Sequence, residues 1–191
     1  MSRAEAESDE ALAARAAGGD RAAFEILVRR YKEIVSRFIR RYVGDWDDGY
    51  DVLQDAFLAA WLNLPRYDHG RPFLPWLYTI ALNKCRDFTR RQKVRRLFLR
   101  AYASERREEN STAVAASQAD VRQTERLRQL DRAIATLPAF YKEPLLLTTA
   151  GGLSHQQAAT LLGTTPKAVE MRVRRARKQL GDAISEAEQE G

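Results

Sequence analysis

The chain has 191 residues and a net charge of +6, and its isoelectric point of about 9.7 favours a polyanionic partner, whether DNA, RNA or anionic lipid. Cys85 is the single cysteine, which excludes an internal disulfide and a cysteine-rich zinc site, and His69 and His155 are too distant in sequence to predict a metal site. No segment has the apolar core of a signal peptide or the roughly 20 apolar residues of a membrane span, so we expect a cytoplasmic protein without metal or other cofactor.

Apolar residues at helical spacing, with few strand-like alternations, predict an all-α protein. In the first half of the chain, glycines and prolines separate helices that we predict over residues 9–17, 21–43, 47–64 and 72–98. The second of these helices begins after Asp20, a good N-cap. The third is predicted to begin at Asp47 or Asp48 as its cap, with Trp46 in the preceding connection.

Composition changes between Ala103 and Asp120, where the residues are small and polar and show no apolar period. We therefore predict two small helical domains, residues 8–100 and 123–186, joined by a flexible linker over residues 101–122. In the second domain, one helix is predicted up to Leu137 and another from Pro138. The predicted core of this domain consists of Leu127, Leu130, Ile134, Phe140, Leu145, Leu146 and Leu147.

The stretch that begins at Ser154 predicts two helices with a tight break between them. Ser154 and Gln157 have the spacing of a capping box, Gly163 suits a left-handed helix end, and Thr165 followed by Pro166 begins the next helix. Arg and Lys fill the outer faces of this second helix. The pattern predicts a helix-turn-helix whose second helix enters a DNA major groove, although a helical hairpin with a solvated basic face has a similar composition.

Three blocks in this order are similar to motifs of one family. The first is DVLQDAF over residues 51–57 with Trp61, and the second is FLPWLYTIALN over residues 73–83. The third block is discontinuous and consists of Leu137-Pro138, Gly152-Leu153-Ser154, Arg172 and the sequence RAR at residues 175–177. Together they resemble a bacterial sigma factor of the sigma-70 family, in its extracytoplasmic-function (ECF) subfamily, over residues 10–182. The resemblance implies a transcription initiation subunit with no active site of its own, whose partners are the β′ and β subunits of core RNA polymerase, promoter DNA and an anti-sigma factor.

The resemblance implies that the helix from Asp51 to Leu64 binds the polymerase β′ subunit. The implied contact residues are Asp51, Gln54, Asp55 and Leu58. Carboxylates suit this role because they accept charge-assisted hydrogen bonds from arginines of a partner. The alternative is that Asp51 and Asp55 only stabilise the N-terminal half of their helix through its dipole.

The resemblance also implies that the loop over residues 66–71 and the following helix bind the −10 promoter element. An opened strand needs a place for an unstacked base and a basic track for its backbone. Alternative roles remain for Asn83 as a buried amide between helices, for Trp76 as a core residue, and for the arginines as a solvated face. The candidates are Tyr67, Asp68, Asn83, Lys84, Arg86, Arg90 and Arg91.

The helix-turn-helix, from His155 to Arg174 and the residues after it, is implied to read the −35 element as duplex DNA. The segment KAVEMR over residues 167–172 departs from the family pattern. Glu170 can accept from a cytosine or pair with Arg174 at i,i+4, which leaves the −35 preference open. Arg174 and Arg175 are the candidates for contacts with base edges. The candidates for phosphate contacts are Lys167, Arg172 and Lys178. The neighbouring Glu170 and Met171 complete the set of candidates in this helix.

Two other classes of protein fit parts of the sequence. One is a stand-alone helix-turn-helix transcriptional regulator with a helical sensor domain, and the other is an adaptor that sequesters an anti-sigma factor. The sequence shows no glycine-rich phosphate loop and no nucleophile constellation, which argues against an enzyme. Two tethered DNA-binding modules gain avidity only when polymerase sets their spacing, so we expect the free chain to bind DNA poorly.

Overall fold

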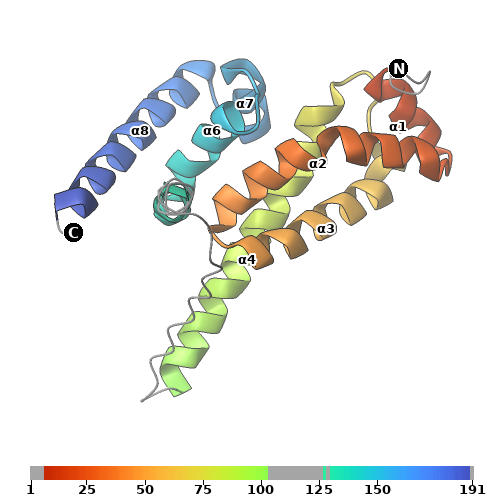
Figure 1. Ribbon diagram of the computed structural model, residues 1–191. Helices are drawn as coiled ribbons and strands as arrows, with labels where there is room; N and C mark the ends of the chain where they lie inside the picture. The colour runs from red at the N-terminus through yellow and green to blue at the C-terminus, as the bar shows by residue number, and fades with distance from the viewer. Residues whose placement is uncertain (1–6, 103–126, 128–129, 190–191) are drawn as a thin grey trace, which may run out of the picture.

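The computed structural model describes residues 7–102, 127 and 130–189, and these form two helical lobes that pack against each other (Figure 1). The first lobe contains α1 (Asp9–Ala17), α2 (Arg21–Val43), α3 (Trp46–Asn63), the 3-10 helix η1 (Leu64–Arg66) and α4 (Phe73–Tyr102). The second lobe contains helical residues 130–136, followed by α6 (Ala139–Thr149), α7 (His155–Leu162) and α8 (Pro166–Gln189). The regular secondary structure of the described residues is helical, with no strand among them, which confirms the predicted all-α class.

The helix boundaries in the first lobe follow local capping chemistry, with one correction to the prediction. Asp20 caps α2 as predicted. At α3 the cap is Asp45, whose carboxylate accepts from the backbone N–H groups of Asp47 at 2.9 Å and Asp48 at 3.0 Å. The prediction of a cap at Asp47 or Asp48 was therefore wrong, and Trp46 is the first helical residue rather than part of the connection. The earlier aspartate satisfies the first backbone donors of the helix, which is what an N-cap does.

The core of the first lobe is built around α2, which contacts α1, α3 and α4. Phe38 on α2 and Tyr78 on α4 are fully buried, and their ring centroids lie 5.0 Å apart in an edge-to-face arrangement. At the other end of α2, Phe24 lies against Trp61 of α3 with ring centroids 5.0 Å apart. Such aromatic pairs add to area burial, and they join α3 and α4 to α2.

The helix α4 is longer than the sequence predicted. It continues to Tyr102, so it includes the first two residues of the predicted linker, and its C-terminal half projects beyond the first lobe (Figure 1). Residues 103–122 of the predicted linker lie outside the described residues. Projecting residues on α4 are exposed because no described element covers them; they include Val94, Leu97, Phe98 and Leu99.

The core of the second lobe surrounds α6, which contacts α7 and α8 and also reaches α2 of the first lobe. Residues 142–147 of α6 are all buried, because neighbouring helices enclose this segment on every side. Two residues predicted in this core are instead exposed: Leu127 to 49% and Phe140 to 56%. Phe140 stands in the first turn of α6, before the enclosed segment begins, so helical spacing alone misplaced it.

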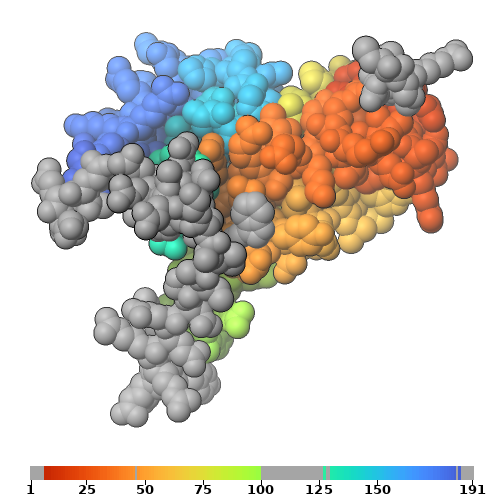
Figure 2. Space-filling view, in the orientation of Figure 1, coloured from red at the N-terminus to blue at the C-terminus, as the bar shows by residue number. Residues whose placement is uncertain are grey.

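The two lobes are in direct contact, as the space-filling view shows for α2 and the second lobe (Figure 2). A methyl group added at Gly151 would lie 2.6 Å from the carbonyl oxygen of Leu147 and 3.1 Å from Cζ of Tyr78 in the first lobe. Gly151 therefore allows both the end of α6 and the close approach of the lobes.

We expect Gly151→Ala to lower the free energy of unfolding by about 1–3 kcal/mol, the usual cost of overpacking a tight site. The control is Gly181→Ala on α8, where no neighbouring atom lies within 4 Å. This control is expected to be neutral or to stabilise the helix by about 0.5–1 kcal/mol. Urea unfolding of both full-length variants measures the difference, and equal stabilities would contradict the close packing at Gly151.

Candidate functional site

The predicted polymerase-binding residues lie on the exposed face of α3. Asp51, Gln54, Asp55 and Leu58 are all exposed, and Leu58 keeps 58% of its accessible surface. Because α3 begins at Trp46, Asp51 and Asp55 lie beyond its first turn. The helix dipole acts mainly within that turn, so it does not account for both carboxylates.

An exposed apolar stripe on α3 was not predicted in full. Tyr50 is 53% exposed and Leu62 is 67% exposed, and both lie on the same helical strip as Gln54 and Leu58. The four residues are spaced four apart, which places them along one side of the helix. This spacing was present in the sequence, and reading it as a surface stripe would have identified Tyr50 and Leu62 as candidate contact residues.

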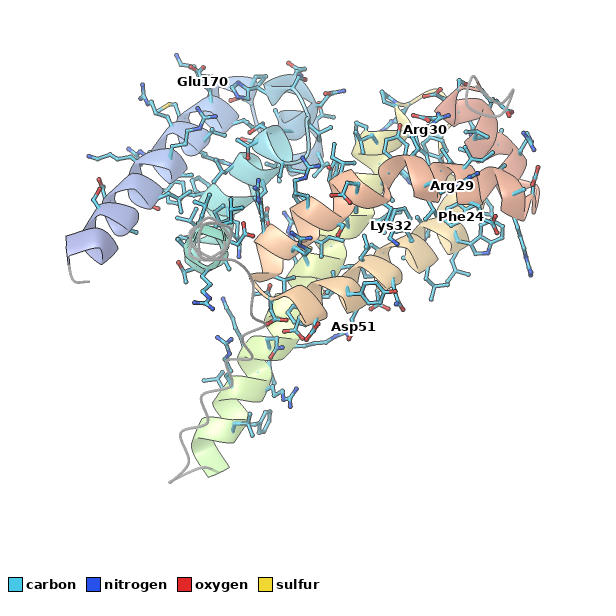
Figure 3. The ribbon with its side chains drawn as sticks, viewed as in Figure 1. Phe24, Arg29, Arg30, Lys32, Asp51 and Glu170 are labelled. Atoms are coloured by element: carbon cyan, nitrogen blue, oxygen red, sulfur yellow. The ribbon has the colours of Figure 1, made fainter. Side chains whose placement is uncertain are left out.

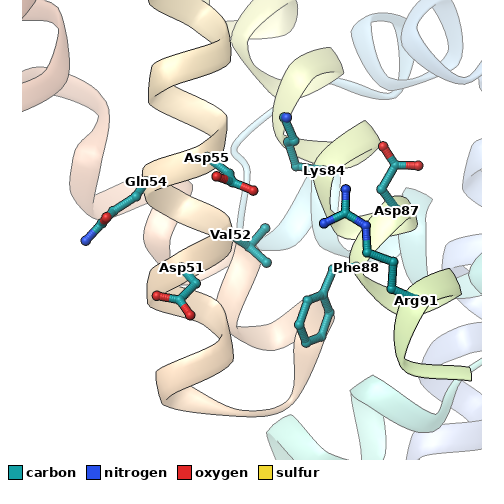
Figure 4. Close-up of a pocket in the computed structure, with 8 residues that line it drawn as sticks. All are labelled: Asp51, Val52, Gln54, Asp55, Lys84, Asp87, Phe88 and Arg91. Atoms are coloured by element: carbon teal, nitrogen blue, oxygen red, sulfur yellow. The ribbon is translucent and has the colours of Figure 1, made fainter. Parts of the chain in front are cut away.

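A groove of about 390 Å³ between α3 and α4 brings together residues that the sequence assigned to different partners. Asp51, Gln54 and Asp55 line one wall, and Lys84 and Arg91 line the other (Figure 4). The polymerase-binding candidates and two of the DNA-binding candidates therefore share one continuous surface. Val52 and Phe88 line the same groove, and Asp87 completes its α4 wall.

Negative charge concentrates around the start of α3. Burial, together with the nearby carboxylates of Asp45 and Asp51, raises the pKa of Asp48. Gln92 of α4 donates to the Asp48 carboxylate at 3.4 Å. This end of the helix thus presents a negative potential suited to a cationic partner surface.

Contacts of its own side chains hold the loop before α4, residues 66–71, in one conformation. Tyr67 is buried at 4% exposure, and its hydroxyl donates to the carbonyl oxygen of Arg71. Burial raises the pKa of Tyr67 to about 12. The ring lies 4.8 Å from Trp76 and 5.6 Å from Phe73 between centroids, so in this conformation it packs in the protein and cannot stack on a base. Asp68 is exposed and accepts from the Gly70 N–H at 3.0 Å, which shapes the turn.

The candidates on α4 have different surroundings. Asn83 is exposed, so its alternative role as a buried amide between helices was wrong. Lys84 and Arg91 line the groove, while Arg90 pairs with Asp87 at 3.0 Å. Arg86 is already bound within the chain, because its guanidinium donates to the carboxylate of Glu143 in the second lobe.

The helix-turn-helix has the capping that the sequence predicted. Ser154 accepts from the Gln157 N–H at 3.2 Å, and the Gln157 side chain accepts from the Ser154 N–H at 2.9 Å. Gly163 ends α7 in the left-handed region, with φ of 62°. Thr165 caps α8 by accepting from the Ala168 N–H at 3.2 Å. These local contacts set the angle at which α8 leaves α7.

The outer face of α8 carries most of the predicted −35 contacts. Val169, Val173, Ala176 and Leu180 are buried on the inner face, which leaves the remaining faces to solvent. Glu170 points away from the rest of the molecule (Figure 3), and among the described side chains no ion pair joins it to Arg174. The other exposed candidates on this helix are Lys167, Met171, Arg174, Arg175 and Lys178.

Arg172 lies at the edge of this surface rather than at its centre. Its guanidinium carbon stacks over the exposed Phe140 ring at 3.8 Å from the centroid. A cation–π contact of this kind holds the guanidinium plane in one orientation. Phe140 is therefore a functional candidate that the sequence placed in the core.

The described residues contain no helix long and apolar enough to cross a membrane. They also contain no group of three or more His, Cys, Asp or Glu side chains placed to hold a metal ion. Cys85 is buried, and burial raises the pKa of its thiol.

Comparison with known proteins matches both lobes to families of the same protein class. Residues 27–96 match the family model described as Sigma-70 region 2, and residues 127–180 match Sigma-70, region 4. The RNA polymerase sigma factor NccH of Alcaligenes xylosoxydans xylosoxydans is 40% identical over 172 residues, covering 90% of this chain and 92% of the relative. The ECF RNA polymerase sigma factor SigD of Mycobacterium tuberculosis is 34% identical over 180 residues, covering 92% of this chain and 83% of the relative.

A solved structure is similar over almost the whole chain. It is CnrH, a sigma factor of Cupriavidus metallidurans, in complex with the cytosolic domain of CnrY. The TM-score is 0.69 at 32% identity, over 94% of this chain and 98% of that chain. This chain therefore belongs to the sigma-70 family of RNA polymerase sigma factors, in its ECF group.

Proposed function

We propose that this chain directs transcription initiation by mounting two DNA-binding lobes on core RNA polymerase. The observation that carries the proposal is the exposed face of α3, where Asp51, Gln54 and Asp55 stand beside the apolar side chains of Leu58 and Tyr50. An apolar strip rimmed by carboxylates suits a partner helix that carries arginines. This face would bind the β′ subunit of the polymerase.

The groove between α3 and α4 places the predicted −10 contacts next to this polymerase-binding face. Asn83 is exposed, so its amide is accessible to donate to and accept from the edge of an unpaired base. Lys84 and Arg91 would neutralise phosphates of the same strand. Strand opening and polymerase binding would thus occur on adjoining surfaces.

The helix α8 would read the −35 element in the major groove. Arg174 and Arg175 are exposed on its outer surface, where the guanidinium fork can bond a guanine bidentately. Lys167 and Lys178 would hold phosphates on either side. The chain itself would carry out no catalytic step, because the chemistry of RNA synthesis belongs to the polymerase.

An anti-sigma factor is the remaining partner of this proposal. The solved relative CnrH is bound to the cytosolic domain of CnrY, and its structure aligns with 94% of this chain. We infer that a comparable inhibitor masks the polymerase-binding and DNA-binding surfaces of this chain. Because core polymerase acts in the cytoplasm, the proposal places the protein there.

Run-off transcription on a random promoter library tests the proposal directly. Core polymerase with the full-length chain is expected to start RNA at a small set of related promoters, whereas core polymerase alone is not. Failure of the chain to join the polymerase or to redirect its start sites would refute the proposal. Tight, sequence-specific duplex binding without polymerase would instead favour a stand-alone helix-turn-helix regulator.

A further inference from the structure

Two buried charges of opposite sign lie at the contact between the lobes. Lys142 and Glu143 are adjacent on α6 of the second lobe, and they are only 4% and 6% exposed. Buried charges are costly unless they are paired and hydrogen-bonded. Both side chains meet this condition with groups that belong largely to the first lobe.

Glu143 is held by two residues of the first lobe. Arg86 of α4 donates from Nε to Oε1 at 2.8 Å and from Nη2 to Oε2 at 2.5 Å, and the Tyr42 hydroxyl donates to Oε1 at 3.2 Å. The bidentate pairing of guanidinium and carboxylate is the strongest form of such a contact. It joins residues that are 57 positions apart in sequence.

Lys142 and a second ion pair complete the contact. The Lys142 ammonium donates to the backbone carbonyl of Tyr42 at 3.1 Å and to that of Ala135 at 2.9 Å, and it lies 4.3 Å from the centroid of the Tyr42 ring. Arg41 of α2 lies 3.2 Å from the carboxylate of Asp131. Apolar groups also meet at this contact, with Gly151 close to Tyr78 and Gly44 close to Ala135. Opening the contact would return the buried charges to water, which lowers the cost of separating the lobes relative to a purely apolar interface.

Arg86 links this contact to DNA. It stands on α4 among the predicted −10 contacts Asn83, Lys84 and Arg90. In the closed arrangement its charge is matched by the Glu143 carboxylate, which would also repel an approaching phosphate. The Arg86 side chain is 47% exposed, but its Nε and Nη2 both donate to Glu143, so a phosphate would compete with this carboxylate for the same pair of donors.

We propose that Glu143 is an intramolecular latch that holds the two lobes closed by occupying Arg86, and that release of Arg86 opens the chain and frees this cation for the DNA backbone. The role of Arg86 toward DNA rests on the proposed function above, whereas the latch itself rests on the contacts between the lobes. The latch explains why the isolated chain would bind DNA poorly without any inhibitor.

The test uses the full-length chain and the variant Glu143→Gln, which keeps the shape of the side chain and removes its charge. Small-angle X-ray scattering is expected to show a larger radius of gyration for the variant. Fluorescence anisotropy with a labelled oligodeoxythymidine is expected to show roughly tenfold tighter binding, the gain produced when the open form rises from about a tenth of the population to nearly all of it. This probe is chosen because a phosphate contact is independent of sequence.

Two further variants separate the latch from a change in net charge. Glu33→Gln makes the same charge change on α2, where the Glu33 side chain is 84% exposed and 3.9 Å from Arg37, and it is expected to change neither size nor affinity by a comparable amount. Arg86→Gln removes the other half of the latch and is expected to expand the chain without tightening DNA binding. The double variant Glu143→Gln with Arg86→Gln distinguishes release of the Arg86 cation from loss of a repulsive carboxylate. Binding that is tightened in the double variant as much as in Glu143→Gln would show that loss of the carboxylate alone is responsible.

Circular dichroism shows whether Glu143→Gln remains folded. If this variant loses its helices, the same measurements are made on Asp131→Asn, which breaks the second ion pair. An unchanged radius of gyration in the folded variant would overturn the latch. Expansion without tighter binding would overturn the competition for Arg86. Neither result depends on polymerase, so both are distinguishable from a failure of the proposed function in run-off transcription.

Discussion

A combined Asp51→Ala, Gln54→Ala and Asp55→Ala variant is expected to bind core RNA polymerase on the order of a hundredfold more weakly than the native chain. Hydrogen bonds to charged groups contribute about 1.5–3 kcal/mol each, and their losses are not fully additive. All three side chains are exposed on α3, so the variant should keep the fold and lose only the partner contacts. Fluorescence anisotropy of the labelled chain titrated with core polymerase measures the change.

Thermal unfolding of the same variant provides the control for its structure. The melting temperature should remain close to that of the native chain, since none of the three residues belongs to the buried face of α3. The matched surface control is Glu25→Ala with Glu33→Ala on α2, which removes two exposed carboxylates elsewhere in the first lobe. If the triple variant binds polymerase as tightly as this control, α3 is not the docking surface.

The second large effect is expected at α8, where Arg174→Ala should weaken −35 recognition by about 1–3 kcal/mol and relax specificity at one base pair. Arg174 is exposed on the face opposite the buried Val169 and Val173, so its removal leaves the packing of the helix-turn-helix in place. The measurement is binding of the reconstituted holoenzyme to promoters that vary at each −35 position.

Lys178→Ala is the comparison for a phosphate contact on the same helix. It should weaken binding about equally on all −35 sequences and reduce the slope of log affinity against log salt by about one. Arg174→Ala should instead change the order of preferred sequences. Identical specificity profiles for the two variants would show that Arg174 does not read a base.

Secondary structure in this chain was predictable wherever neighbouring residues determine it. The capping box of Ser154 and Gln157 and the left-handed Gly163 follow from contacts within a few residues, and helix ends depend on such contacts. The cap of α3 was misplaced because several aspartates in succession are all suitable, and the choice of Asp45 depends on where the preceding helix ends.

Exposure was less predictable than helix position. Helical spacing identified the apolar residues of α6, yet Phe140 is exposed and holds Arg172. Tyr67 was predicted as a −10 contact in the loop over residues 66–71, and it is buried against Trp76. Burial depends on which surfaces of other elements arrive at a residue, and a single helix pattern does not contain that information.

The sequence by itself determined the helical class, the helix-turn-helix and the family, because these follow from local chemistry and from motifs contained within short blocks. Only the tertiary structure decided that Asp51 and Arg91 share one groove and that Arg86 is bound by Glu143. Both results require segments far apart in the chain to meet. Their meeting depends on packing of the lobes and on pairing of buried charge, which no spacing along the chain encodes.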